Sequence, residues 1–311
     1  MKSILDYIDN KKHEFAQLPF FDYLRDSSID PLQRLSFIPC ASPFIMSFRD
    51  LNKHVFCDAN STDELQLIIN QHARQDEHHW IWFLEDLEKL GLNPVLDFRE
   101  TLKTLWNDET VCARQLVHEI YRTTYQRSPI EKLVVIESIE TTGSTFFGIV
   151  SEFVQTLEHS KQEQCRYFGA YHLEADPGHT YCTEATLQYI ENIELTGAMH
   201  SQQLAVVDLI FDAFARFTDG MLAYAQKHPA RAPLVQQRPR IGTCLIDAGL
   251  ITLEQLDAAL TEQKTRPQRL GEILASHGWV KQQTVEYLIR QFAGSERKLT
   301  SMNEPSLVLM N

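Results

Sequence analysis

The sequence lacks the cysteine spacing that marks a thiolate metal site or a disulfide framework. Its six cysteines are scattered and never spaced as Cys-x2-Cys, so we expect buried free thiols. Long apolar runs are also missing, because no stretch approaches the roughly 18 uncharged residues of a membrane-spanning helix. The amino terminus becomes charged before any apolar run forms, which disfavours a secretory signal. We therefore expect a cytoplasmic protein without membrane insertion.

Basic side chains are scarce. The 311 residues contain 29 Lys and Arg against 42 Asp and Glu, giving a net charge of −13. Residues 1–225 hold 34 acidic and 18 basic side chains, whereas the remainder is slightly basic. Repulsion from phosphates makes nucleic acid an unexpected partner for this larger part. With 43% hydrophobic residues the chain can bury a large core, and its length favours two domains.

Period-two alternation, which strands require, is also scarce, and helical spacing dominates up to about residue 225. The sequence therefore predicts an all-α fold. We expect a helical metal-binding domain at 1–226, a proline-containing linker at 227–239, a helical repeat domain at 240–292 and a tail at 293–311. The predicted helices of the first domain span about 3–18, 30–53, 61–91, 97–126, 129–159, 162–175, 180–192 and 198–226.

The most specific pattern is the spacing His-x3-Asp-x2-His, which occurs twice, about a hundred residues apart. The triplets are His72, Asp76 and His79, then His172, Asp176 and His179. On a helix, positions i, i+4 and i+7 fall within about 60°, so each triplet would present its side chains on one face. One such pattern is usually a surface contact, but two identical triplets of imidazole and carboxylate favour iron, manganese or zinc. Pro177 should kink or unwind the helix at Asp176.

Two metal ions need a further carboxylate, and the predicted helix 129–159 supplies two candidates. Glu137 and Glu140 lie among apolar neighbours, where a carboxylate is costly unless it is paired. Glu140 is our first choice. Glu137 is the second, and it could equally face solvent or pair with an arginine. Gly143 and Gly148 would let another helix approach closely.

Four of these candidates have the order and spacing of the metal-binding residues in heme-oxygenase-like di-iron oxidases and oxygenases. They are Glu140, His172, Asp176 and His179. The resemblance covers about residues 15–225. Segment 72–79 sits where that family places an earlier acidic residue and a histidine, but the usual Glu is replaced here by His72 or Asp76. The resemblance implies a heme-oxygenase-like helical bundle, two iron ions (or manganese) and dioxygen-dependent oxidation of a small organic substrate.

Beyond the linker, the chain contains an internal repeat of Arg-x-Gly, two apolar residues, a second glycine and spaced apolar residues. Arg-x-Gly should start a short helix, and the second glycine should end it in a left-handed cap before another short helix. Units this small cannot bury an apolar face alone, so the two copies should form one compact module. The residues that define the repeat are Arg240, Gly242, Gly249 and Gln263 in the first copy, and Arg269, Gly271 and Gly278 in the second.

This repeat resembles the cyclic di-GMP-binding N-terminal domain of MshE-type secretion and pilus ATPases, whose two motifs lie five residues apart. Here residues 264–268 supply the five. The resemblance implies that the arginines and glycines meet phosphates while leucines and isoleucines cover the bases, which suits the chemistry of arginine and helix starts. The alternative is a protein-docking module whose arginines only cap helix ends.

The leading hypothesis is therefore a non-heme di-iron oxidase with cyclic di-GMP as a regulatory ligand, acting on a small molecule and dioxygen, with a homodimer as a further option. The first alternative is a hydrolase that uses two metal ions to activate water. The second is a non-catalytic helical adaptor that senses nucleotide.

Overall fold

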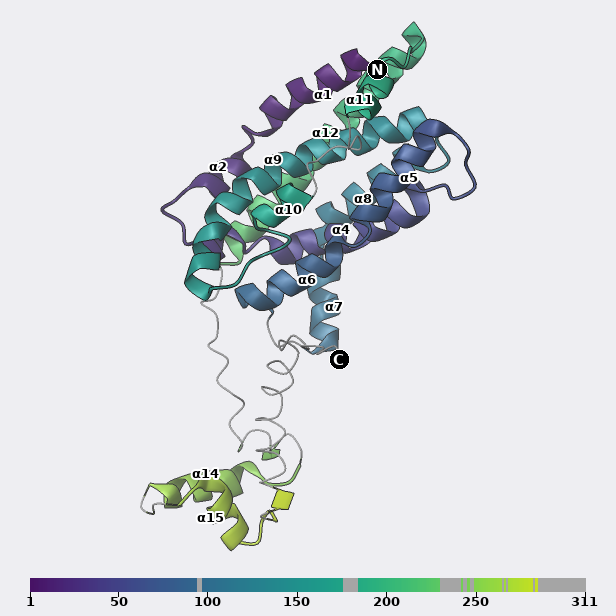
Figure 1. Ribbon diagram of the computed structural model, residues 1–311. Coiled ribbons are helices and arrows are strands. Elements are labelled where there is room, and N and C mark those ends of the chain that lie inside the picture. Colours follow the sequence, from purple (N-terminus) through teal and green to yellow (C-terminus); the bar gives the residue numbers. More distant parts are fainter. Residues whose placement is uncertain are drawn as a thin grey trace, which may run out of the picture. The chain divides into compact units, whose positions relative to one another are not determined.

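The computed structural model of the protein describes residues 1–93, 97–175, 184–229, 242, 245–246, 249–264, 266, 268–281 and 283–284 (Figure 1). Every regular element among these residues is a helix, which confirms the predicted all-α fold. The chain divides into two compact units, Met1–Pro233 and Leu234–Asn311. Each unit contains its own hydrophobic core.

The first unit is built from α-helices with two short irregular helices between them. In chain order they are α1 (Lys2–Phe15), α2 (Pro19–Arg25), α3 (Pro31–Arg34), α4 (Ile38–Leu51), the π-helix η1 (Asn52–Phe56), α5 (Glu64–Asp76), α6 (His79–Leu90), α7 (Phe98–Trp106), the 3₁₀ helix η2 (Asp108–Thr110), α8 (Val111–Thr124), α9 (Pro129–Lys161), α10 (Ala170–Ala175), α11 (Glu184–Glu191) and α12 (Gly197–Lys227).

The long helix α9 is the central element of this unit. Its start is fixed by a capping box, in which the Ser128 hydroxyl accepts from the Glu131 amide and the Glu131 carboxylate accepts from the Ser128 amide, followed by Pro129 in the first turn. Helices α1, α10 and α12 pack along α9 (Figure 1). Every side chain from Lys132 to Thr142 is buried, so this stretch forms a wall of the core.

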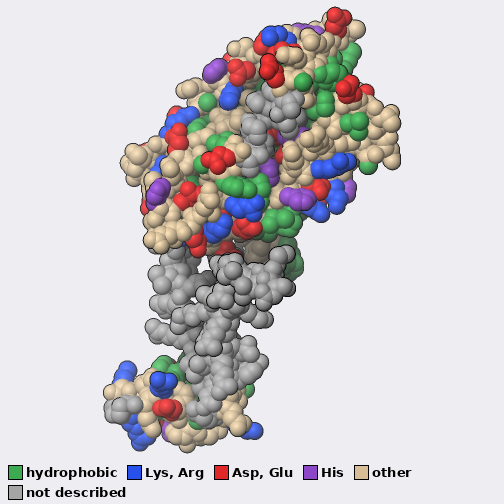
Figure 2. Space-filling view, viewed as in Figure 1, with side chains coloured by type: hydrophobic (Ala, Val, Ile, Leu, Met, Phe, Trp, Pro, Cys, Tyr) green, Lys and Arg blue, Asp and Glu red, His purple; other side chains and the backbone are tan. Residues whose placement is uncertain are grey.

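Among the described helices, α9 alone is long and apolar enough to cross a membrane by length and composition. Of that apolar stretch, 67% is buried inside the unit, as in the central helix of a folded domain. On the face shown in Figure 2, acidic and basic side chains of the described part of the first unit are interspersed rather than gathered into one patch.

Two predicted long helices are interrupted. The segment expected as one helix over 61–91 forms α5 and α6, with Glu77 and His78 between them. His is a weaker helix former than Glu, so the helix gains least from continuing through His78, which precedes the first turn of α6. The segment expected over 97–126 breaks at Asn107, whose side-chain oxygen accepts a hydrogen bond from the Thr110 amide and starts a new helix.

A third expected helix, over 162–175, is shorter than predicted. Only α10 is helical, because the backbone amides of residues 166–168 donate to the carboxylate of Asp86 instead of joining a helix. The predicted kink at Asp176 and Pro177 lies outside the described residues.

The second unit contains α14 (Leu253–Gln263) and α15 (Leu270–Ser276). The two copies of the repeat have the same turn. Gly249 and Gly278 both have positive φ, at 66° and 70°. Both glycines therefore adopt the left-handed conformation that was predicted for them. In both copies the residue after the glycine donates its amide to the carbonyl five positions earlier, from Leu250 to Leu245 and from Trp279 to Leu274. Apolar residues from both copies share one core, so the copies form a single module as expected.

Candidate metal centre

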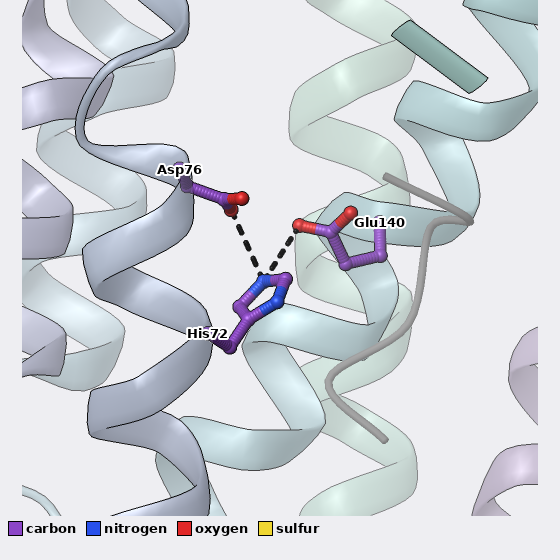
Figure 3. A group of neighbouring side chains, drawn as sticks. All are labelled: His72, Asp76 and Glu140. Atoms are coloured by element: carbon purple, nitrogen blue, oxygen red, sulfur yellow. Dashed lines mark hydrogen bonds and ion pairs between the residues drawn. The ribbon is translucent and has the colours of Figure 1, made fainter. Parts of the chain in front are cut away.

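Three buried side chains from two helices converge at the centre of the first unit. His72 and Asp76 lie one turn apart near the end of α5, and both point toward Glu140 on α9 (Figure 3). The Nε2 atom of His72 is 3.1 Å from an Asp76 oxygen and 3.1 Å from a Glu140 oxygen. Potential ligand atoms of all three residues lie within 4.8 Å of one another. This arrangement could hold a metal ion.

The charges of these side chains are strongly coupled. Burial lowers the pKa of His72, but the negative charges of Asp76 and Glu140 outweigh burial and bring that pKa to about 12. Burial raises the pKa of Asp76, yet the neighbouring His72 imidazole more than offsets this and lowers it. One imidazole nitrogen carries at most one proton and cannot donate a linear bond to two carboxylates. A cation between the three groups would satisfy all of them.

Two more imidazoles lie beside this group. The Nδ1 atom of His79, at the start of α6, is 4.0 Å from an Asp76 oxygen. The His79 ring is 4.7 Å from the ring of His172 on α10, measured between centroids. Asp76 is the last residue of α5 and His79 is the first of α6, so the two side chains stay close together across the break between the helices.

His172 is prepared to act as a ligand through its Nε2 atom. Its Nδ1 atom is 2.9 Å from the Tyr167 carbonyl oxygen. A carbonyl oxygen only accepts, so Nδ1 carries the proton. Burial, and then the charge of His79, lower the pKa of His172 to about 3. The imidazole is neutral at pH 7, and its Nε2 lone pair can bind a metal ion, as in sites where a carbonyl orients a ligating histidine.

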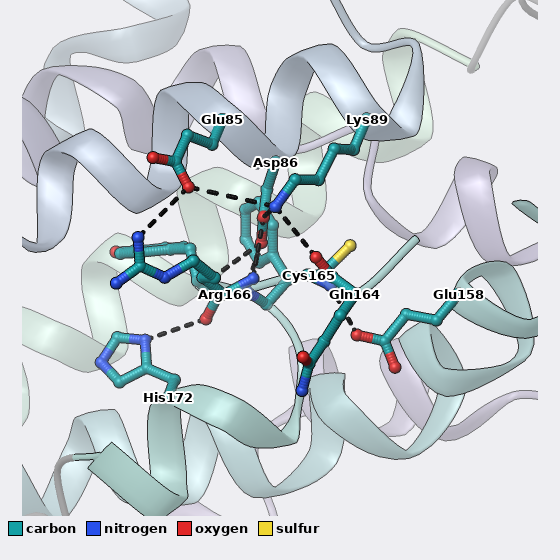
Figure 4. A network of polar contacts seen from close by, with 10 residues as sticks. Glu85, Asp86, Lys89, Glu158, Gln164, Cys165, Arg166 and His172 are labelled. Atoms are coloured by element: carbon teal, nitrogen blue, oxygen red, sulfur yellow. Dashed lines mark hydrogen bonds and ion pairs between the residues drawn. The ribbon is translucent and has the colours of Figure 1, made fainter. Parts of the chain in front are cut away.

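A buried carboxylate on α6 holds the segment that leads to His172. Asp86 is fully buried and accepts backbone hydrogen bonds of 2.8 to 2.9 Å from Arg166, Tyr167 and Phe168 (Figure 4). Burial raises the pKa of Asp86, while the three amides act in the opposite direction. Asp86 lies seven positions after His79 on the same helix. One face of α6 thus supplies an imidazole to the centre and fixes the carbonyl that orients His172.

The centre opens onto an apolar cavity of about 120 Å³. Asp76, His79, Glu140 and His172 all line it. The Phe147 ring lies 3.8 Å from the His172 ring between centroids and covers it. A reacting group in this cavity would be next to the candidate ligands.

The structure brings together five of the seven predicted metal-site residues, and the other two, Asp176 and His179, lie outside the described residues. The five are His72, Asp76, His79, Glu140 and His172. Both alternatives for the first ligand, His72 and Asp76, belong to the group, and Glu140 rather than Glu137 supplies its α9 carboxylate. Glu137 is also buried, so the expectation that it could face solvent was wrong.

The expectation for two glycines of α9 was also wrong. A Cβ atom built on Gly143 would meet only the Phe147 ring, at 4.0 Å, and one on Gly148 would meet nothing within 4 Å. Among the described residues, no backbone of another helix lies within 4 Å of a Cβ atom built on either glycine.

Of the seven nucleotide-site candidates, Arg240 lies outside the described residues, and the other six are placed. Arg269 is exposed at the start of α15, and Gly271 is buried in its first turn. A Cβ atom on Gly242 would lie 2.6 Å from a Leu256 methyl carbon, so a larger residue here would force the Leu256 side chain to shift. The side-chain amide of Gln263 donates to the Gln268 carbonyl. These contacts account for Gly242 and Gln263 within the module itself.

Asp86, Tyr167 and Phe147 were missed as parts of the site. Only Asp86 carries a signal in the sequence, because it lies two helical turns after His79 and therefore on the same face of α6. No protein-family model matches the chain, and no curated protein matches it in sequence.

Proposed function

We propose that the first unit is a non-heme di-iron oxidase or oxygenase that uses dioxygen to oxidise a small organic substrate. The observation that carries this proposal is the buried convergence of His72, Asp76 and Glu140 within 4.8 Å, beside the imidazoles of His79 and His172. Imidazole and carboxylate donors without thiolate suit iron or manganese.

The donor set fits such ions. His72, Asp76 and Glu140 would hold one ion, and His79, His172 and the predicted ligands Asp176 and His179 would complete the centre. Two ferrous ions supply electrons for the reduction of dioxygen when they are bound. The chain itself contributes five candidate ligands that lie close together and a mostly apolar cavity beside them.

Positioning is the main task of the surrounding residues. The Tyr167 carbonyl fixes the tautomer of His172, and Asp86 holds the backbone that carries this carbonyl. The Phe147 ring limits the movement of the His172 imidazole. Ligands held in this way lose little freedom when a metal ion binds.

Metal loading of the full-length chain tests the proposal. After anaerobic incubation with ferrous iron and removal of excess metal, about two iron ions per chain should remain, and admission of oxygen should change the optical spectrum. His172→Ala should lower the iron content, whereas His159→Ala, at an exposed histidine of α9, should not. Less than one iron per chain, or equal iron content in both variants, contradicts the proposal. Retention of zinc or magnesium with phosphoester turnover would identify a two-metal hydrolase instead.

We further propose that the second unit binds cyclic di-GMP and that this ligand regulates the oxidase. Support comes from two repeat copies that share the same glycine turn and one core, with Arg269 exposed at a helix start. Arginine binds phosphate through two parallel hydrogen bonds.

Titration calorimetry of the full-length chain with cyclic di-GMP tests whether the second unit binds this nucleotide. Arg240→Ala and Arg269→Ala should each weaken binding, whereas Arg266→Ala, at an exposed arginine that pairs with Glu262, should not. No binding at about 100 µM, where a site worth roughly −5.5 kcal/mol is half filled, contradicts it. Regulation further requires that oxidase turnover differ with and without the nucleotide. Nucleotide binding without metal binding would identify a sensing adaptor.

A further inference from the structure

The cavity beside the candidate metal centre has two chemically distinct parts. Asp76, His79, Glu140 and His172 lie close together on one part of its lining. Eleven of the other described lining residues are phenylalanine, tyrosine or tryptophan, and most of them come from α1, α2, α4, α6, α9 and α12. The rings contact one another in mostly edge-to-face arrangements, as between Phe44 and Phe214 at 5.7 Å. A molecule bound in the cavity would therefore contact the candidate metal-binding side chains on one side and aromatic rings on the others.

Among the described lining residues, two threonines and one arginine already have partners and offer little to a charged guest. The hydroxyl groups of Thr142 and Thr218 donate to carbonyls of their own helices, at Ile139 and Ala215. Arg49 is the one lysine or arginine among the described lining residues, and its guanidinium pairs with a neighbouring exposed carboxylate at 3.0 Å. A substrate charge placed among the aromatic rings would therefore lose its hydration without gaining a partner.

We propose that this cavity receives an uncharged apolar group of the substrate, a benzene-sized ring or a short alkyl chain, and holds it against the His/Asp/Glu cluster. Apolar cavities of about 150 Å³ stay dry and bind benzene, and the cavity here, at about 120 Å³, is of comparable size. This inference rests on the proposed oxidase function, because it names the class of substrate for that site.

Gly143 forms part of the cavity wall. It lies three residues after Glu140 on α9 and lines the cavity, and a Cβ atom built on it would have its nearest neighbour, the Phe147 ring, at 4.0 Å. Because Gly143 lines the cavity, a larger side chain at this position would extend into it. Gly148, on the same helix, does not line the cavity and has open space around it. The two glycines form a matched pair of positions.

Binding of benzene to the metal-free, full-length chain tests this inference without iron chemistry. Ligand-observed NMR or calorimetry should show saturable binding to the wild type, at least tenfold weaker binding to Gly143→Leu, and unchanged binding to Gly148→Leu. Benzoate, which matches benzene in ring size but carries a charge, should bind at least tenfold more weakly than benzene. Gly143→Ala, which adds one methyl group, should give an intermediate loss and replaces Gly143→Leu if the larger variant does not fold.

Three results would overturn the inference: no saturable benzene binding to the folded wild type, equal binding to the Gly143 and Gly148 variants, or benzoate binding as tightly as benzene. The outcome is separable from the proposed function. A chain that retains iron but rejects benzene contradicts the substrate class alone. A chain that binds benzene but retains no iron contradicts the oxidase proposal, while the cavity assignment stands.

Discussion

At the scale of single residues, the candidate ligands are held in place by contacts with one another and with groups that would not bind the metal. His72 meets two carboxylates with one nitrogen, and His172 is turned by a backbone carbonyl. Behind that carbonyl lies Asp86, which accepts three backbone amides in a fully buried position. The geometry of the site therefore depends on hydrogen bonds one layer outside the cluster.

Metal binding should release a proton from His72. Its pKa in the folded, metal-free chain is raised from 6.5 to about 12, so the imidazole is protonated at pH 7. A raised histidine pKa stabilises the fold below pH 6.5, and this contribution is lost only as pH rises toward the folded value. A ligating imidazole must lose the proton, so metal affinity should increase with pH.

Calorimetry in buffers of different ionisation enthalpy measures this proton release. His72→Ala should release about one proton fewer per metal bound than the wild type. Equal release by the two proteins would show that His72 does not exchange a proton for the metal.

Replacing Asp86 by Asn should destabilise the unit and weaken metal binding. Asn keeps a single acceptor oxygen and places an NH2 group against the backbone amides, so the charge-assisted hydrogen bonds, each worth about 1.5–3 kcal/mol, are weakened or lost. We expect the free energy of unfolding to fall by at least about 2 kcal/mol in chemical denaturation. Glu85→Gln, at the neighbouring part-exposed position, should change it by less than about 0.5 kcal/mol. Wild-type stability and metal affinity in Asp86→Asn would contradict this role.

At the scale of helices, the sequence predicted the elements better than their interruptions. Apolar periodicity and caps located α9 and α12 to within two residues at each end. The break at Glu77 and His78 was missed, because neither proline nor glycine marks it. The spacing of polar residues among apolar ones did predict that His72, Asp76 and Glu140 share a site. These residues meet because the apolar faces of α5 and α9 are buried together. Contacts with Tyr167 and Phe147 depend on the path of the chain between helices, which periodicity does not encode.

Close packing of α8 against α12 gives a test of the helix arrangement. A Cβ atom on Gly220 would lie 2.4 Å from the Cys112 sulfur, so Gly220→Ala should lower the free energy of unfolding by about 1–3 kcal/mol. Cys112→Ala in the same chain should recover most of this loss, which a double-mutant cycle measures. Gly197→Ala, at an open position of α12, should not destabilise. A cycle with no coupling between Gly220 and Cys112 would contradict the described packing.

At the scale of the whole molecule, the chain combines a large acidic helical unit with a small helical repeat, each with its own core. The two-part division was predicted from the proline-containing segment and the repeat. The second unit depends on glycines that adopt positive φ at its two turns. The two cores contain different residues, so a substitution in one unit can be made and its effect on the other unit measured.

Gly278→Ala should destabilise the second unit alone. An alanine in left-handed geometry costs roughly 1–2 kcal/mol, whereas Gly278→Asn should cost less because Asn tolerates this conformation. In a thermal melt followed by calorimetry, the transition of the second unit should shift down, and iron content of the first unit should stay at the wild-type level. Loss of iron in Gly278→Ala would contradict the independence of the two cores.

The most direct test of the central claim is anomalous diffraction at the iron edge from crystals of the iron-loaded protein. We expect two strong peaks in the first unit, one of them within bonding distance of the His72 imidazole and the carboxylates of Asp76 and Glu140. Peaks elsewhere, or none at this cluster in fully loaded crystals, would contradict the assignment of a di-iron centre.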